Sequence, residues 1–384
     1  MRIHRLATIV IFGCAALSGA GRLAAAGPAG PLATVPFEEF GSSVFLPVSV
    51  NGSRPLWLIL DSGANTCIVD QARARELGIQ PQEEGRGTGA GAGTTPYRKL
   101  RQEDVSFKLK SLAFSCEHTI AMDFSQNFEV TGHELEGVLG SDFFQRFVVE
   151  IDYDARVVRL FEPASFEYRG RGEPVPLLFD KRVPHVMAEL TVTGEPPQTK
   201  RLLVDSGSED AVDDDIVLKS QGPKREVTGG VGTGQEYKVT FGTLSRFRLG
   251  SFVLETVPSV APGVALIGGE VLRRFTVTFD YSRQRMYLEP NRHLNDAFEG
   301  TDSQGMELRL AADRKNLRVH DVHKGSPAEK AGLRTGDLIT DIDGTAASDL
   351  GFRRAMRLLR RSGQSFRLQV ERDSRRLEVL LAGG

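Results

Sequence analysis

Apolar and polar residues alternate over short segments in much of this chain, which is the pattern of half-buried β-strands. Residues 44–50 alternate in this way, and Asn51-Gly52 supplies a hairpin turn before the apolar run 56–60. The same period of two recurs in residues 147–151 and 275–279. Helical signals are brief by comparison. The pattern predicts a mainly β fold.

The chain also repeats itself. Three pairs of segments match in the same order: residues 58–63 with 202–207, 107–111 with 247–251, and 139–160 with 267–288. The distance between matching segments shrinks along the chain, as it would if the second copy had shorter loops. Chance would not keep three matches in order, so a duplication is the better explanation. We therefore predict two related β-lobes, residues 33–165 and 174–291.

Each predicted lobe carries Asp-Ser-Gly directly after an apolar strand, as Asp61-Ser62-Gly63 and as Asp205-Ser206-Gly207. A single copy is an ordinary turn, but two copies at matching points of a duplication indicate a shared role. Two carboxyl groups in contact cannot both ionise cheaply, so such a pair shares a proton. The ionised member can act as a base and the protonated member as an acid on a water between them. Such a pair can hydrolyse a peptide bond, so Asp61 and Asp205 are the candidate catalytic residues.

The residues around each Asp fit such a site. The glycine of each motif would let the backbone turn tightly, so that both carboxyl groups lie near one plane. The serine of each motif could form hydrogen bonds across the axis between the lobes and fix both loops. Apolar segments that end in Gly140 and Gly268 would lie beside the motifs and keep the site partly dry.

These motifs resemble the aspartic proteases of the retropepsin-like and pepsin-like type, with both lobes in one chain. The matching segments are residues 60–64 with 138–140, and residues 204–208 with 266–268. The resemblance implies a duplicated two-lobe β-barrel fold, a catalytic dyad within one chain, an active monomer, and protein or peptide substrates. Two alternatives stay open: a non-catalytic peptide-binding scaffold that kept the fold, and a homodimer that uses only Asp61 of each chain.

That family also closes a glycine-rich hairpin, the flap, over its substrate. Glycine-rich segments lie where two flaps would fall: residues 85–93, with Gly89 and Gly91, and residues 229–234, with Gly230 and Gly232. Neither segment has the spacing or the strand–helix context of a dinucleotide site. A flexible linker is the alternative for each.

The second motif departs from the family pattern. Glu209 and Asp210 follow it, and residues 213–215 are all Asp, whereas the first motif continues with mostly apolar residues. Acids that face Asp205 would raise its pKa, but a solvated surface turn is the favoured interpretation. The spacing is not that of a calcium-binding loop.

Residues 304–384 follow a polar linker and carry a signature of their own. Ser326-Pro327 and Glu329 form the start of a short helix that Gly332 ends, and a longer helix is predicted from about 349 to 361. This part resembles an α+β PDZ domain of the bacterial protease-associated kind. Such domains bind an extended peptide as an added strand beside the longer helix.

The resemblance places the peptide-binding loop of this domain near four residues: Gly305, Met306, Glu307 and Leu308. Glu307 departs from the family, which often has a second glycine there. The predicted longer helix carries five arginines, Arg353, Arg354, Arg357, Arg360 and Arg361. We expect them to form a solvated helix face rather than a site for an acidic partner.

Residues 1–26 have the order of a cleaved secretory signal, which is a basic start, an apolar stretch and small residues before the cut. The apolar stretch is shorter than the about 20 residues that cross a bilayer, and no later segment is long enough. Lipid attachment at Cys14 is disfavoured because Phe12 fits poorly before it. We expect export to the periplasm or the extracellular medium, with no membrane span after signal cleavage.

Composition removes other classes of function. Lysine plus arginine is 48 and aspartate plus glutamate is 50, and the resulting net charge of -2 gives no drive toward nucleic acid. The chain has no His-Glu-x-x-His pair, no zinc spacing, no nucleophile elbow and no phosphate loop. We therefore expect no metal and no organic cofactor.

Cys67 and Cys116, which remain after signal cleavage, can form a disulfide in an oxidising compartment or stay buried as two free thiols.

Overall fold

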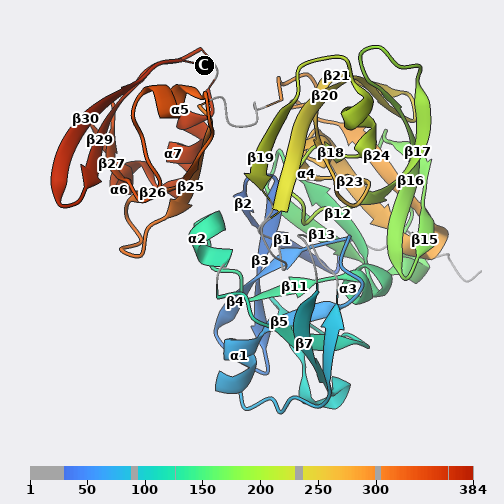
Figure 1. The fold of residues 1–384 in the computed structure, drawn as a ribbon. Helices are drawn as coiled ribbons and strands as arrows, with labels where there is room; N and C mark the ends of the chain where they lie inside the picture. The colour runs from blue at the N-terminus through green and yellow to red at the C-terminus, as the bar shows by residue number, and fades with distance from the viewer. Residues whose placement is uncertain are drawn as a thin grey trace, which may run out of the picture.

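Two β-lobes and a smaller C-terminal β-domain make up the described part of the computed structural model, which covers residues 30–87, 94–125, 127–229, 237–298, 304–361 and 363–383 (Figure 1). The mainly β fold with barrel-like sheets, predicted from the sequence, is confirmed. No helix in this part of the chain is both long and apolar enough to cross a bilayer.

The first lobe is built on one sheet with the strand order β6-β7-β10-β5-β11-β4-β3-β8-β9, and β2 pairs with β3. Its elements are β2 (Glu38–Phe40), β3 (Ser43–Val50), β4 (Pro55–Leu60), β5 (Cys67–Asp70), α1 (Gln71–Glu76), β6 (Glu84–Gly87), β7 (Thr95–Leu100), β8 (Phe107–Leu109), β9 (Leu112–Phe114), β10 (Thr119–Met122), α2 (Asn127–Thr131), β11 (Gly137–Leu139) and α3 (Ser141–Arg146). The alternation in β3 has the expected consequence, because Val44, Leu46, Val48 and Val50 are all buried in the main core.

The second lobe repeats this plan with the strand order β15-β16-β17-β22-β18-β21-β20-β19. Its elements are β15 (Leu178–Asp180), β16 (Val183–Thr191), β17 (Gln198–Val204), β18 (Val212–Asp213), β19 (Arg225–Gly229), β20 (Tyr237–Leu249), β21 (Phe252–Ala261), β22 (Leu266–Ile267) and α4 (Gly269–Leu272). In both lobes a parallel pair supports the Asp-Ser-Gly motif: β4 with β11 in the first lobe, and β17 with β22 in the second.

A third sheet joins the lobes, and each half of the chain contributes three of its strands. In order across the sheet they are β1 (Ala33–Pro36), β13 (Val157–Phe161), β12 (Val148–Asp152), β23 (Phe275–Asp280), β24 (Arg285–Pro290) and β14 (Glu173–Pro176). The two halves meet where β12 pairs with β23 through Glu150 and Thr278. Because Val149, Ile151, Val277 and Phe279 are buried on both sides of this junction, the sheet fixes one lobe against the other.

The C-terminal domain has the strand order β25-β26-β27-β29-β30. Its elements are β25 (Met306–Leu310), β26 (Leu317–Val322), α5 (Pro327–Lys330), β27 (Leu338–Ile342), β28 (Thr345–Ala346), α6 (Ala347–Leu350), α7 (Phe352–Leu359), β29 (Phe366–Arg372) and β30 (Arg375–Leu381). Ser326 caps α5 as predicted, since its Oγ accepts the N–H of Glu329 at 3.1 Å. The single long helix is wrong, because Gly351 adopts φ +72° and divides it into α6 and α7.

A disulfide connects Cys67 at the start of β5 to Cys116 just before β10. It joins the two ends of the segment that carries α1, β6 and β7. Of the two alternatives that the sequence left open, the structure therefore shows the disulfide.

Candidate active site

Asp61 and Asp205 each stand at the end of a buried strand and beside a second strand that runs parallel to it. The N–H of Asp61 donates to the carbonyl of Leu139 at 3.0 Å, and the N–H of Asp205 donates to the carbonyl of Ile267 at 2.9 Å. The apolar segments that end in Gly140 and Gly268 thus lie beside the two motifs, where the sequence placed them.

The two carboxyl groups are held in the same way. Oδ1 of Asp61 accepts the N–H groups of Gly63 at 2.8 Å and Ala64 at 2.9 Å. Oδ1 of Asp205 accepts the N–H groups of Gly207 at 2.9 Å and Ser208 at 3.1 Å. These bonds fix one oxygen of each carboxyl group. Because the bonds match, the two carboxyl groups hold equivalent positions on either side of the axis that relates the two lobes.

The serines of the two motifs exchange hydrogen bonds across the same axis. Ser62 Oγ donates to the carbonyl of Val204 at 2.7 Å and accepts the N–H of Ser206 at 3.0 Å. Ser206 Oγ donates to the carbonyl of Leu60 at 2.8 Å and accepts the N–H of Ser62 at 3.0 Å. Both serines are fully buried. Every donor and acceptor in this network is satisfied, so each loop holds the other in register.

The glycines of the motifs are required for a reason that the sequence did not show. Neither Gly63 nor Gly207 is among the positive-φ glycines, so a tight turn does not demand them. A Cβ on Gly63 would lie 2.6 Å from Cγ of Asp205, and a Cβ on Gly207 would lie 2.5 Å from Cγ of Asp61. Each glycine therefore makes room for the carboxyl group of the opposite lobe.

The same kind of close approach explains the glycines of the supporting strands. A Cβ on Gly140 would lie 2.1 Å from the carbonyl oxygen of Thr66, and a Cβ on Gly268 would lie 2.3 Å from the carbonyl oxygen of Asp210. Backbone cannot give way as a flexible side chain can. Only glycine lets these segments pack against the chain that follows each motif.

The environment of the two carboxyl groups favours their protonated forms. Burial and then the charge of Asp205 raise the pKa of Asp61 well above its ordinary value, against the lowering effect of the N–H groups of Ala64 and Gly63. Burial also raises the pKa of Asp205, although its hydrogen bond with Asp61 lowers it. Two carboxyl groups that interact this strongly titrate as one unit rather than as two separate groups.

Sequence reasoning missed Tyr281, which lies directly after β23. Burial and the charges of Asp61 and Asp205 raise the pKa of its hydroxyl well above the ordinary value. The structure gives this hydroxyl no hydrogen-bond partner among the described residues. Asp152-Tyr153 and Asp280-Tyr281 recur at matching points of the duplication, which was the only signal that could have pointed to it.

The acids after the second motif do not form a simple solvated turn. Asp214 is buried, and its Oδ1 accepts the N–H of Ile216 at 2.8 Å. Burial and the charges of Asp210 and Asp205 raise the pKa of Asp213. Glu209 accepts hydrogen bonds from both terminal nitrogens of Arg353, one of them at 2.8 Å. The interpretation as a solvated surface turn is therefore wrong for Asp214 and Glu209, whereas Asp210 and Asp215 are exposed, as that interpretation expects.

The predicted flap glycines, Gly89, Gly91, Gly230 and Gly232, lie outside the described residues. The strands on either side of each segment are described, and they pair antiparallel, β6 with β7 and β19 with β20. Tyr97 of β7 lies against Gly85, where a Cβ would be 2.4 Å from its ring. The same ring packs against a small apolar cluster that contains Phe45 and Ile59.

One group of side chains in the described residues has the composition of a metal site. Glu117, His118 and Asp142 place possible ligand atoms within 4.8 Å of one another. Arg182 of the second lobe lies among them, however, and donates to His118 Nδ1 at 2.6 Å and to Asp142 Oδ1. A cation would have to displace this guanidinium. The group is better explained as an ion-pair network between the lobes.

In the C-terminal domain, the four predicted peptide-binding residues lie at the start of the edge strand. Met306, Glu307 and Leu308 belong to β25, and only Gly305 precedes it, with φ +71°. Glu307 forms an ion pair with Arg309 at 3.1 Å. The structure thus puts three of the four residues in a strand rather than in a loop. Of the five arginines predicted to form a solvated helix face, four are exposed, namely Arg354, Arg357, Arg360 and Arg361. Arg353 is the exception, since it is half-buried and pairs with Glu209.

A duplicated pair of Asp-Ser-Gly loops over a shared sheet defines a mainly β, two-lobed fold in which the two loops meet. Comparison with family models gives the class, since residues 46–143 match the aspartyl protease model and residues 300–382 match the PDZ domain model. The chain therefore contains an aspartyl protease domain and a C-terminal PDZ domain. The first match includes Asp61 and Gly140, whereas the second lobe lies outside both matches.

Proposed function

We propose that this protein is an exported aspartic endopeptidase, that Asp61 and Asp205 of one chain form its dyad, and that its PDZ domain binds substrate or partner peptides. One observation carries the catalytic part: two carboxyl groups from related loops come together, and each faces the glycine of the other loop. This arrangement supplies one base and one acid at the same place.

The proposed reaction begins with a water bound between the two carboxyl groups. The ionised Asp takes a proton from this water as its oxygen bonds to the carbonyl carbon of the peptide, and the other Asp gives its proton to the carbonyl oxygen. When the resulting diol collapses, the first Asp protonates the leaving nitrogen and the second takes a proton from the diol. The C–N bond breaks, and the pair again holds one proton. Because the pair titrates as a unit, neither Asp is assigned the starting proton.

The geometry favours this proposal over the two alternatives. A homodimer built on Asp61 has no need for Asp205, yet both carboxyls have matched hydrogen bonds within one chain. A binding scaffold has no need for two carboxyls that the fold holds at raised pKa, since that arrangement reduces stability at neutral pH.

Hydrolysis of an unfolded protein tests the catalytic proposal. The intact protein should cleave it, and a peptide analogue with a hydroxyl group in place of the scissile carbonyl should inhibit, because it resembles the diol. Asp61→Asn should lose hydrolysis and keep its fold, as judged by circular dichroism. Undiminished turnover by the folded variant would reject the dyad.

Export is supported by the signal-like order of residues 1–26 and by the disulfide between Cys67 and Cys116, which persists in oxidising compartments. Expression of the full chain followed by mass spectrometry of the product tests it. We expect a mature N-terminus near residue 27 in the exported fraction. A protein that keeps Met1 and stays in the cytosol would contradict export.

A further inference from the structure

A short segment that begins with α2 connects the first lobe to the PDZ domain, in addition to Arg353, whose guanidinium lies 5.7 Å from the centre of the Phe40 ring. α2 lies against β25, and Phe128 packs on the apolar core of the PDZ domain. Gly132 is so close to α7 that a Cβ on it would be 2.4 Å from the ring of Phe352. Figure 1 shows α2 between the PDZ domain and the first lobe. An edge strand and the longer helix are the two walls between which a PDZ domain holds a peptide. Residues 127–134 therefore occupy part of this groove.

The occupied part is the end of the groove remote from Gly305. Gln304 Nε2 lies 3.5 Å from the carbonyl of Arg361, just beyond the C-terminal end of α7, whereas Phe352 is the first residue of that helix. α2 thus covers the groove near the start of α7. A peptide that paired along the whole of β25 would collide with it.

The charged and aromatic contacts between residues 127–134 and the PDZ domain indicate which kind of peptide could bind in their place. The guanidinium of Arg314 lies 4.0 Å from the centre of the Phe128 ring, and it also pairs with Glu134 at 3.4 Å. Arg318 pairs with Glu129 at 3.1 Å. If residues 127–134 left, they would expose an apolar site beside two arginines. An aromatic residue next to acidic residues complements such a site.

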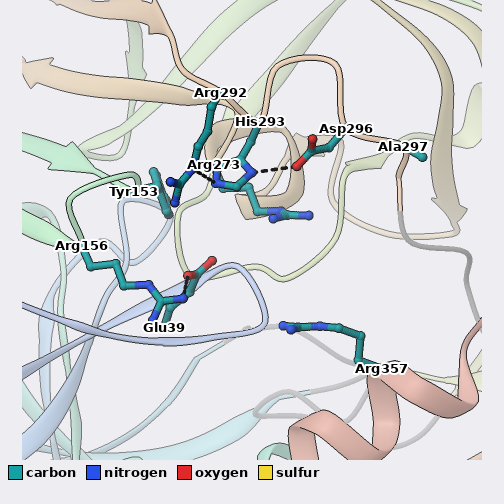
Figure 2. A pocket seen from close by; sticks show the side chains of 9 residues that line it. All are labelled: Glu39, Tyr153, Arg156, Arg273, Arg292, His293, Asp296, Ala297 and Arg357. Carbon is teal, nitrogen blue, oxygen red and sulfur yellow. Dashed lines mark hydrogen bonds and ion pairs between the residues drawn. The ribbon is translucent and has the colours of Figure 1, made fainter.

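The rest of the seam between α7 and the lobes contains two cavities. Arg357 extends from α7 into a cavity of about 430 Å³ (Figure 2). Most of the side chains that line this cavity are charged, among them Glu39, Arg156, Arg273 and Arg357. A second cavity of about 600 Å³ lies beside the same helix and shares Glu39, Arg156 and Arg357 with the first. Among the described residues of the two lobes, Phe128 of α2 packs on the apolar PDZ core, whereas the exposed ion pairs of this seam add little.

We propose that residues 127–134 are an internal ligand of the PDZ domain, and that extended peptides with an aromatic residue beside acidic residues compete with them for the groove. Binding of such a peptide displaces α2 and releases the PDZ domain from the first lobe. This inference rests on the proposed peptide-binding role of the PDZ domain, and it does not depend on catalysis by Asp61 and Asp205.

Peptide binding to the full chain tests the competition. The Asp61→Asn background keeps the probe intact, and the probe is a fluorescent twelve-residue peptide with one Phe followed by Glu residues. The apparent affinity equals the intrinsic affinity multiplied by the fraction of molecules in which the groove is open. Because Phe128→Ala raises this open fraction, it should bind the probe about tenfold more tightly. Glu129→Gln, which removes the partner of Arg318, should bind it a few-fold more tightly. Glu167→Gln is the matched control, since Glu167 pairs at 3.1 Å with Arg169, far from this seam in the sequence, and it should leave the affinity unchanged.

Hydrogen exchange in the protein with native residues 127–134 gives a second readout that needs no folded Phe128 variant. Addition of the probe should speed amide exchange in residues 127–134, because the backbone amides of α2 become exposed to solvent when α2 leaves the PDZ domain. A probe with Lys in place of Glu should bind more weakly and have little effect on exchange. Equal affinity in all variants with unchanged exchange would overturn the competition. Equal binding of the Lys probe would overturn the proposed ligand class. Both results are obtained without hydrolysis, so an inactive enzyme would leave this inference standing.

Discussion

Gly63 of the first lobe lies directly against the carboxyl group of Asp205 in the second, and Gly207 lies in the same way against Asp61. The two motifs are thus complementary in shape as well as related in sequence. Each supplies one carboxyl group and the space that the other carboxyl group needs.

Gly63→Ala should remove most activity without a large loss of stability. Because the backbone of Gly63 is not in the left-handed region, alanine meets no left-handed strain there, but the new Cβ would push the Asp205 carboxyl away. A displacement of about 1 Å in a catalytic group costs on the order of 100-fold in rate. Turnover of a peptide substrate and the melting temperature should be measured together.

Gly78→Ala is the matched control for that variant. Gly78 has φ +69° and open space around its Cα, so alanine there should cost about 1 kcal/mol of stability and leave turnover unchanged. If Gly63→Ala kept full activity, the close packing of the two loops would have no role in catalysis.

Asp205→Asn should be as damaging as Asp61→Asn, and the double variant should be little worse than either. Residues that act as one unit are not additive in their effects on rate. Turnover of the three variants, measured over a range of protein concentrations, checks this. Active Asp205→Asn whose activity falls on dilution would instead indicate a homodimer of Asp61 sites.

The raised pKa values predict that the dyad reduces stability as the pH increases. Below the ordinary pKa of 3.8, the carboxyl is protonated in both the folded and the unfolded protein. As the pH rises from 3.8 through the raised folded-state pKa, the unfolded chain loses this proton more readily than the folded protein, so the free energy of unfolding falls. Asp61→Asn should therefore melt at a higher temperature than the parent at pH 7, and the two should converge below pH 3.8. Melting curves from pH 3 to 8 test this. A difference that stays constant with pH would mean that the dyad is not responsible.

The ion pair between Arg353 and Glu209 should couple the PDZ domain to the second lobe. The side chains of Arg353 and Glu209 are 24% and 37% exposed, so the coupling energy should be up to about 1 kcal/mol. A cycle of Arg353→Gln, Glu209→Gln and the double variant, read from denaturant unfolding, measures it. Arg354→Gln is the control on the same helix and should show no coupling with Glu209→Gln. Additive effects in the first cycle would remove this link.

The position of Glu209 makes this link relevant to the site. Glu209 lies shortly after Asp205 in the same loop, and its side chain lies against Gly41 of the first lobe. A Cβ on Gly41 would be 2.5 Å from Cδ of Glu209. Ser42 and Ser43 donate to the carbonyls of Glu209 and Gly207. The PDZ domain therefore contacts a loop that is already fixed between the two lobes.

The amino-acid sequence by itself determined the β-rich fold, the duplication, the two Asp-Ser-Gly motifs and the PDZ signature. These features are local: alternation with a period of two shows which residues of a strand are buried, and a motif repeated in order shows equivalent positions. The boundary between α6 and α7 was missed, because a single glycine within a helical pattern does not by itself reveal a positive φ.

Only the tertiary structure decided which distant groups meet. It paired Cys67 with Cys116, placed Glu209 on Arg353 and set Phe128 on the PDZ core. It also showed that Gly63 makes room for a carboxyl group rather than for a turn. Each of these depends on the distance between residues far apart in the chain, and such distances follow from the packing of whole lobes, which no local pattern of residues encodes.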